Sequence, residues 1–161
     1  MSEMLTTSRR PRPEPDANLG YLFRLAHQRF RALLERELED LGLSAQEYGI
    51  LSVFEYRPEL SISELARISQ VTRQTMHTSI LSLEATGLVE RRGVNRRVVL
   101  VRPTKRGRKR LEAATHRVRA VERAALAGLD GEEERTVRTW LANLAALTTS
   151  PREGTKRREK S

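Results

Sequence analysis

The sequence predicts a mainly α-helical protein with a small β-hairpin, organised around a winged helix-turn-helix. Three observations support this fold class. Two amphipathic helical segments with a short polar turn between them occupy residues 61–86. Two β-favouring runs follow directly, at residues 88–101, and they enclose a short turn sequence. Apolar residues at helical spacing continue on both sides of this unit, as expected for flanking helices.

The first helix of the helix-turn-helix begins at a capping box, because Ser61 is followed three residues later by Glu64. Its buried face is expected to contain Ile62, Leu65, Ala66 and Ile68. Ser69 and Gln70 interrupt the pattern, and Thr72 can cap the second helix. The apolar face of that helix is expected to contain Met76, Ile80, Leu81 and Leu83. Gly87 ends it, and in such motifs the second helix enters the DNA major groove.

A basic hairpin, or wing, is predicted after the second helix. Its strands are expected at Leu88–Arg92 and Arg97–Val101, with Gly93–Arg96 as a four-residue turn. From residue 87 to residue 110 the chain carries ten Lys or Arg and a single acidic residue, Glu90. A charge imbalance of this kind is typical of a surface that binds a phosphate backbone.

Composition limits the other classes of function. The formal net charge is +9 over 161 residues, and the chain has no cysteine, which excludes disulfides and Cys-based zinc sites. Aromatic residues make up only 4%, which argues against base stacking as the main mode of nucleic-acid binding. No apolar run approaches a membrane span, and no secretory signal is evident. We therefore expect a cytoplasmic protein that needs neither membrane nor cofactor.

Two further helices precede the helix-turn-helix. Asn18 can cap a long helix that reaches about Leu41, and Gly42 ends it. Ser44 and Glu47 form a second capping box, which opens a helix to about Tyr56. This helix is expected to bury Tyr48, Leu51 and either Val53 or Phe54.

Two helices are also expected after the wing. Thr104 can cap the first, which extends to about residue 127, and Asp130 with Glu133 can cap the last. The apolar positions of the first follow heptad spacing at Leu111, Ala114, Val118, Val121 and Ala125. The last helix has an apolar face made of Val137, Trp140, Leu141, Leu144 and Leu147. We expect these faces to form a homodimer interface, with an intramolecular helical bundle as the alternative.

The predicted domain organisation follows from these elements. Residues 1–17, which hold Pro11, Pro13 and Pro15, form a disordered arm, and residues 150–161 form a basic disordered tail. Residues 18–149 form a single domain. Within it the winged helix-turn-helix spans about residues 44–103, and the dimerisation helices span about residues 18–41 and 104–149.

The chain from about residue 18 to residue 147 resembles the MarR family of bacterial transcription regulators. The resemblance rests on LGLS at residues 41–44, ELA at 64–66, LEATGLVER at 83–91 and TKRG at 104–107. It implies a homodimeric winged helix-turn-helix that binds palindromic operators in double-stranded DNA and releases them when a small, often aromatic, ligand binds. Two positions depart from the family pattern: Asn95 replaces the aspartate that commonly precedes the tip arginine of the wing, and Pro103 replaces an aliphatic residue.

The candidate DNA-reading residues lie near the start of the second helix of the motif: Arg73, Gln74, Thr75, His77 and Thr78. Arg suits guanine and Gln suits adenine, although the same residues could also form an ordinary solvated helix face. Arg96 and Arg97 could enter a minor groove or only neutralise phosphates. Ser61, Thr72 and Lys105 are predicted to contact phosphate or to cap helices. The family resemblance places an effector near His27, Arg31 and Tyr48, for which a core or interface role is the alternative.

An enzymatic function is not expected. The sequence has no Gly-rich phosphate loop, no nucleophile elbow and no paired acid–base set. The three histidines fall on different predicted helices without the spacing of a metal site. The function predicted is therefore that of a sequence-specific regulator, most simply a repressor. The alternative is an architectural protein that binds DNA without sequence preference through charge alone.

Overall fold

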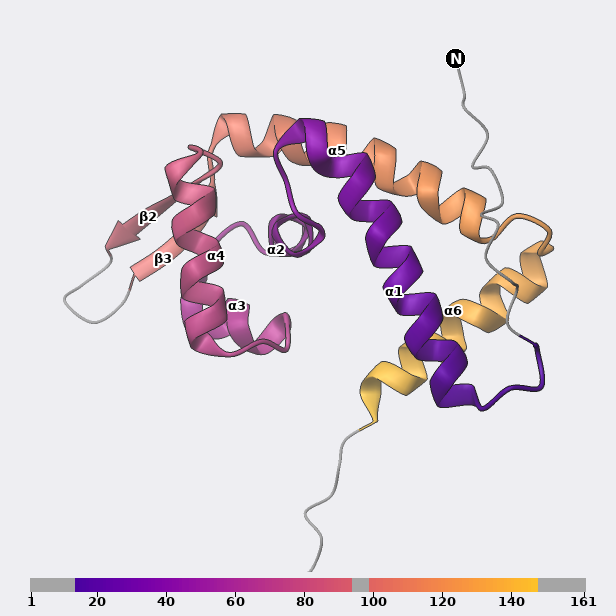
Figure 1. Cartoon of the computed structure of the whole chain (residues 1–161). Helices are drawn as coiled ribbons and strands as arrows, with labels where there is room; N and C mark the ends of the chain where they lie inside the picture. Colours follow the sequence, from indigo (N-terminus) through magenta and orange to yellow (C-terminus); the bar gives the residue numbers. More distant parts are fainter. Residues whose placement is uncertain (1–13, 94–98, 148–161) are drawn as a thin grey trace, which may run out of the picture. The chain divides into compact units, whose positions relative to one another are not determined.

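The computed structural model describes residues 14–93 and 99–147, and the chain divides into two compact units, residues 1–125 and 126–161 (Figure 1). The elements of the first unit are α1 (Leu19–Leu38), the 3-10 helix η1 (Glu39–Leu41), α2 (Ala45–Val53), β1 (Leu60–Ser61), α3 (Ile62–Ile68), α4 (Arg73–Ala85), β2 (Val89–Gly93), β3 (Val99–Pro103) and α5 (Lys105–Ala125). The second unit contains α6 (Gly131–Ala146). The predicted fold class, mainly helical with a small hairpin, is confirmed.

The predicted helix starts are confirmed by their capping hydrogen bonds. The Asn18 side chain accepts a hydrogen bond from the backbone N–H of Tyr21, at the start of α1. Complete capping boxes open α2 at Ser44, α3 at Ser61 and α6 at Asp130. These bonds satisfy N–H groups that a helix leaves without intrahelical partners. The sequence therefore fixes where most of the helices begin.

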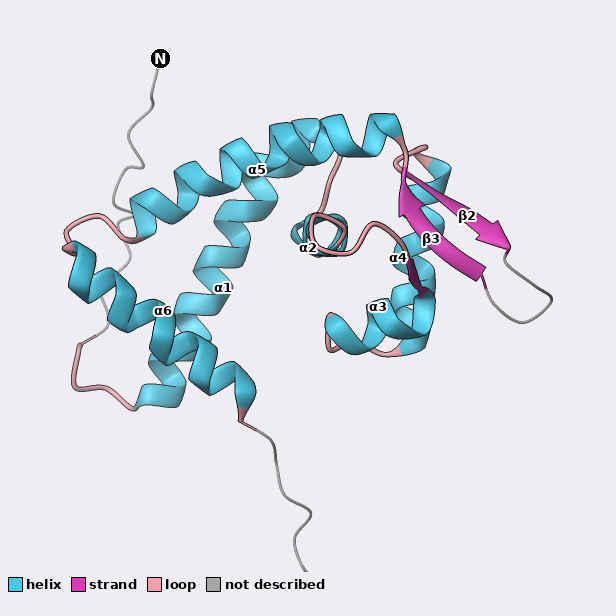
Figure 2. Ribbon diagram, turned by 180° about the vertical axis from the view of Figure 1, so that it is seen from behind, coloured by secondary structure: helices cyan, strands magenta, loops and turns pink. Residues whose placement is uncertain are grey.

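The sheet has three antiparallel strands in the order β1-β3-β2 (Figure 2). Strands β2 and β3 pair with Arg91 opposite Val101, and β1 adds Leu60 opposite the same valine. The hairpin was predicted, but each strand lies one or two residues later than expected, and β1 was not predicted. A two-residue strand is too short to show an alternating pattern. The turn residues 94–96, including Asn95, lie outside the described residues.

Most of the predicted core is confirmed, with two corrections in the helix-turn-helix. Leu65 and Ala66 of α3 are buried, but Ile68 is exposed, because it ends the helix at the rim of a hollow beside α2. On α4, Ile80 is fully buried whereas its neighbour Leu81 is 42% exposed. Consecutive residues of a helix point about 100° apart, and at this position the turn carries Leu81 away from the core. Of the two residues expected to be alternatives at the end of α2, Phe54 is buried and Val53 is only partly buried.

The heptad seam of α5 lies inside this chain, which corrects the prediction that it forms an intermolecular contact. Leu111, Ala114 and Val118 belong to the hydrophobic core of the first unit, where α5 packs against α1 and α2. Val121 is also buried, but Ala125 is exposed. Heptad spacing identifies a helix face that needs a partner, and it does not tell a helix of the same chain from one of another chain.

The joint between the wing and α5 is held by Thr104. Its hydroxyl donates to the carbonyl oxygen of Gly87 at 2.7 Å and accepts from the N–H of Gly107 at 3.0 Å, which confirms its predicted capping role. A Cβ atom on Gly107 would lie 1.9 Å from the carbonyl oxygen of Leu88. The first turn of α5 therefore packs directly on the backbone that leaves α4, and residue 107 must be glycine.

The α6 helix has no buried residue, and Leu141 and Leu147 on its apolar face are exposed. Leu19 and Tyr21 on α1 are exposed as well. These apolar side chains therefore leave much of their surface exposed within their own units. Among the described residues, no helix combines the length and the apolar character required to cross a membrane.

Candidate DNA-binding surface

Helix α4 presents two opposed faces. Met76, Ile80 and Leu83 are buried at 1% exposure or less and hold the helix on the core. The predicted DNA-reading residues all lie exposed on its first two turns: Arg73, Gln74, Thr75, His77 and Thr78. Thr72 fixes the start of the helix, because its hydroxyl accepts a hydrogen bond from the N–H of Thr75 at 3.1 Å. The arrangement places a row of donors and acceptors on a rigid, capped helix end.

Two hydrogen bonds that the sequence did not reveal attach α4 to α2. The Gln46 side-chain amide donates to the Ser79 hydroxyl at 2.8 Å. The Ser82 hydroxyl donates to Oε1 of Glu47 at 2.7 Å. Both serines lie on the side of α4 that faces α2, and their partners lie in the first turn of α2. The orientation of α4 is therefore fixed by polar contacts in addition to its apolar face.

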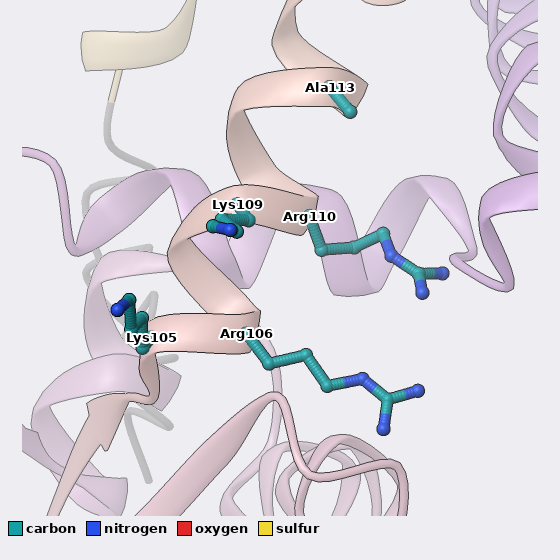
Figure 3. A pocket seen from close by; sticks show the side chains of 5 residues that line it. All are labelled: Lys105, Arg106, Lys109, Arg110 and Ala113. Carbon is teal, nitrogen blue, oxygen red and sulfur yellow. The ribbon is translucent and has the colours of Figure 1, made fainter.

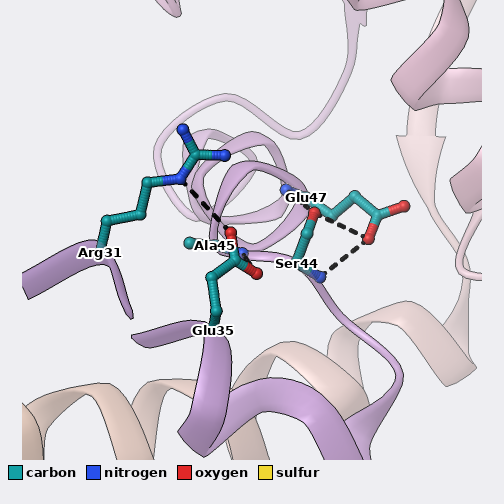
Figure 4. A network of polar contacts seen from close by, with 5 residues as sticks. All are labelled: Arg31, Glu35, Ser44, Ala45 and Glu47. Atoms are coloured by element: carbon teal, nitrogen blue, oxygen red, sulfur yellow. Dashed lines mark hydrogen bonds and ion pairs between the residues drawn. The ribbon is translucent and has the colours of Figure 1, made fainter. Parts of the chain in front are cut away.

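The start of α2 is attached to α1 as well (Figure 4). Oε2 of Glu35 on α1 accepts a hydrogen bond from the backbone N–H of Ala45 at 3.1 Å. Its other oxygen faces Nε of Arg31 at 3.5 Å, a contact close to the limit of a hydrogen bond. Next to it, Oε2 of Glu47 accepts from both the N–H and the hydroxyl of Ser44. One turn of α2 thus contacts α1 on one side and α4 on the other.

Salt bridges neutralise part of the positive charge at the base of the wing. Nη2 of Arg91 lies 2.6 Å from Glu84, and Nε of Arg102 lies 2.7 Å from Glu90. The carboxylate of Glu84 raises the pKa of Arg91 further above its ordinary value. Arg96 and Arg97 lie outside the described residues. Their contact with DNA stays a prediction.

Ser61 and Lys105 occupy the places expected for helix starts. The Ser61 hydroxyl donates to Oε2 of Glu64 at 2.7 Å and accepts from the N–H of the same residue, so it serves as a cap. Hydrogen bonds from the Ser61 hydroxyl and backbone N–H lower the pKa of Glu64 below its ordinary value. Lys105 is exposed at the first position of α5. Phosphate contacts by Ser61, Thr72 and Lys105 remain predictions.

The predicted effector residues differ in their exposure. His27 and Arg31 are exposed on α1, while Tyr48 of α2 packs partly buried against the core. A hollow of about 700 Å³ lies elsewhere, between the end of α2, the end of β3 and one side of α5. Its lining combines apolar residues, such as Phe54 and Leu111, with cations on α5. The described residues include no group of three or more His, Asp or Glu side chains arranged to hold a metal ion.

Comparisons with known proteins agree with this architecture. A model of the MarR family matches residues 41–97. The HTH-type transcriptional repressor Rv2887 of Mycobacterium tuberculosis is 34% identical over 133 residues, which cover 81% of this chain and 96% of the relative. Its crystal structure in complex with DNA superposes with a TM-score of 0.67, over 81% of this chain and 100% of that one.

Two further structures extend the comparison. The complex of Rv2887 with salicylic acid gives a TM-score of 0.64 at 34% identity, over 81% of this chain and 98% of that one. A probable transcriptional regulator from Pseudomonas aeruginosa gives a TM-score of 0.74 at 29% identity, over 80% of this chain and 98% of the other. These relatives make the protein a regulator and not an enzyme, as the sequence predicts. The chain belongs to the MarR family of DNA-binding transcription regulators.

Proposed function

We propose that this protein is a repressor that binds a palindromic operator as a homodimer and leaves it when a small aromatic carboxylate binds. The observation that carries the proposal is the group of exposed polar side chains at the capped start of α4: Arg73, Gln74, Thr75, His77 and Thr78. In helix-turn-helix proteins this end of the second helix contacts base edges in the major groove. The wing arginines Arg96 and Arg97 then contact the flanking backbone or minor groove. Because its target is chromosomal DNA, the proposed location is the cytoplasm.

A homodimer would provide the two half-sites of a palindrome with two copies of α4. The exposed apolar residues of α1 and α6, among them Leu19, Tyr21, Leu141 and Leu147, support this assembly. Burial of such side chains against a second copy is favourable, at about 25 cal/mol per Å² of apolar surface. In the proposed organisation these two helices, together with the end of α5, form the interface, and residues 44–103 bind DNA.

The hollow beside α5 has the chemistry of a site for an aromatic carboxylate. Phe54 and Leu111 provide apolar contact, and three arginines outnumber the two acidic residues of the lining, Glu55 and Glu112. The arginines are Arg108, Arg119 and Arg123. The hydroxyl of Thr115 is buried in the same region and has no hydrogen-bond partner among the residues that the structure describes. A buried polar atom without a partner is costly, and a ligand oxygen would satisfy it. The solved complex of Rv2887 with salicylic acid suggests the ligand class. A second proposed set of effector-binding residues consists of His27, Arg31 and Tyr48.

Selection of bound sequences from a randomised duplex pool tests the DNA-binding part of the proposal. The expected product is a palindrome with two half-sites about one helical turn apart, the spacing of two-fold related recognition helices. A pool that stays random after repeated rounds would instead support an architectural protein held by charge.

The effector site is tested separately, by titrating salicylate into the complex with the selected DNA. Thr115→Val should weaken the release by salicylate, because it removes the hydroxyl available to the ligand. Arg31→Gln serves as the comparison on α1. If Arg31→Gln abolishes the response and Thr115→Val leaves it unchanged, the effector binds near α1 and the hollow beside α5 is not its site.

A further inference from the structure

Four basic residues cluster on the first turn and a half of α5: Lys105, Arg106, Lys109 and Arg110, here called the α5 patch (Figure 3). Together with Ala113 they line an open hollow of about 500 Å³. Arg106 and Arg110 extend to the same side of the helix, and the two lysines lie on the adjacent face. Ala113, one turn beyond Lys109, leaves this surface unobstructed.

Unlike Arg91, Arg102 and Arg117, the members of the α5 patch have no acidic partner among the described residues. Arg91 is paired with Glu84, and Arg102 with Glu90. Further along α5, Arg117 is paired with Asp40 and also donates to the carbonyl oxygen of Glu37. No salt bridge or side-chain hydrogen bond to another described residue involves a member of the patch. The charge of the patch is therefore available to an outside partner.

This arrangement is unfavourable for the isolated helix. Lys105 with Lys109, and Arg106 with Arg110, are like-charged pairs at a spacing of four residues, which destabilises a helix. They also stand at the helix N-terminus, where the macrodipole favours anions, and the first turn of α5 contains no acidic residue. A bound polyanion would offset both the repulsion between the like charges and their unfavourable interaction with the macrodipole.

The position of the α5 patch relative to α4 separates it from the base-reading residues. Thr104, immediately before the patch, is hydrogen-bonded to Gly87, just after the C-terminal end of α4. The DNA-reading residues begin at Arg73, at the other end of this 13-residue helix, which is about 20 Å long. The major groove is only about 8.5 Å deep. With the start of α4 in the groove, the patch lies outside that groove.

We propose that the α5 patch binds phosphates of the DNA that adjoins the operator, without reading its sequence. The proposal rests on the DNA binding proposed above and adds a second contact surface to it. The four cations extend over about 8 Å of helix, so they can meet more than one phosphate. No aromatic or acidic side chain lines the hollow to hold a base or a ribose, which favours a phosphate backbone over a nucleotide ligand.

Two double variants of the full chain test the proposal: Arg106→Gln with Arg110→Gln, and the control Arg29→Gln with Arg36→Gln. Both remove two charges from a helix, and the control pair is exposed on α1. Affinities are measured over a salt series for a duplex of operator length and for one extended on both sides. On the extended duplex the first variant should lower the slope of log K against log salt by about two units, one for each lost phosphate contact. On the short duplex, and for the control on both, the slope should stay near wild type.

The proposal is overturned if the first variant lowers the slope no more than the control does. It is also overturned if the first variant lowers the slope equally on the short and the extended duplex. Binding of tripolyphosphate by wild type but not by the first variant, without any dependence on duplex length, also overturns it and assigns the patch to small anions. The test remains valid if the operator itself is wrongly inferred. A protein without sequence specificity would bind random and operator duplexes equally, but the dependence on length would still distinguish the two variants. Without DNA, the first variant should melt at a higher temperature than wild type, which shows that it is folded.

Discussion

The Ser82 hydroxyl on α4 donates a 2.7 Å hydrogen bond to Oε1 of Glu47, whose Oε2 accepts from the backbone N–H of Ser44. One carboxylate thus caps α2 and holds α4. Because Glu35 on α1 accepts from the next N–H of α2, the first turn of α2 connects α1 with α4. A shift of α1 would therefore change the position of the residues that face DNA.

The first prediction concerns this connection. Glu47→Gln should weaken binding to the selected operator, because it removes the negative charge that caps α2 and receives the Ser82 hydrogen bond. Its effect on stability should be about 1 kcal/mol, as for the loss of a helix cap. Ser82→Ala tests the contact to α4 alone. In a double-mutant cycle the two changes should not be additive, and the exposed Glu59→Gln should have no effect. Strict additivity would mean that the residues do not act together.

The second prediction concerns the joint between the wing and α5. Gly107→Ala should destabilise the fold by about 1–3 kcal/mol, because the new methyl group would overlap the carbonyl oxygen of Leu88. Gly49→Ala is the matched control, since nothing lies within 4 Å of the Cβ it would add to α2. The control should stabilise the protein by roughly 0.5–1 kcal/mol through helix propensity. The prediction is confirmed if the melting temperature falls in Gly107→Ala and rises in Gly49→Ala. Equal shifts of the melting temperature in the two variants would contradict it.

The third prediction concerns pH. Hydrogen bonds from Ser61 lower the pKa of Glu64 below its ordinary value of 4.5. A carboxyl with a lowered pKa in the folded state stabilises the fold above its ordinary pKa and loses this effect as the pH falls through the lowered value. Ser61→Ala should move the pKa of Glu64 upward, measured by NMR titration of the carboxyl carbon, and should make the stability less dependent on pH below 4.5. An unchanged pKa would show that the capping box does not hold the charge.

The fourth prediction concerns the wing tip, beyond the described residues. Arg97→Ala should reduce affinity mainly by removing charge and should lower the salt slope by about one unit. Asn95→Asp should weaken binding, because an added negative charge repels phosphate whether or not it orients Arg97. Affinities across a salt series measure both effects. An unchanged slope in Arg97→Ala would mean that the wing does not contact DNA.

Local sequence signals predicted the helices well, because capping depends on residues three positions apart. Ser44 with Glu47, and Ser61 with Glu64, form the capping boxes expected of them. Contacts between distant segments were not predictable in the same way. The seam of α5 carries a correct periodicity, but its partner is α1 and α2 of the same chain. Strand β1 arises only because Leu60 meets Val101, 41 positions later in the numbering.

The same limit applies to the candidate site. The exposed face of α4 follows from the spacing of Met76, Ile80 and Leu83, so its polar residues could be identified from the sequence. The hydrogen bonds that join Gln46 and Glu47 of α2 to serines of α4 could not be identified, because each joins residues more than 30 positions apart. The availability of the α5 patch also depends on which other arginines find acidic partners in the fold. Charge counts along the sequence treat all of these arginines alike.

The reading of bases by α4 is the central claim, and the affinities of Arg73→Ala and Gln74→Ala test it most directly. Each is measured on the selected operator and on a random duplex of equal length, with Arg67→Ala on α3 as an exposed control. Each substitution should cost about 1–3 kcal/mol on the operator and little on random DNA, since a lost base contact affects only the cognate sequence. Equal losses on the two duplexes would contradict the claim and would make both residues phosphate contacts.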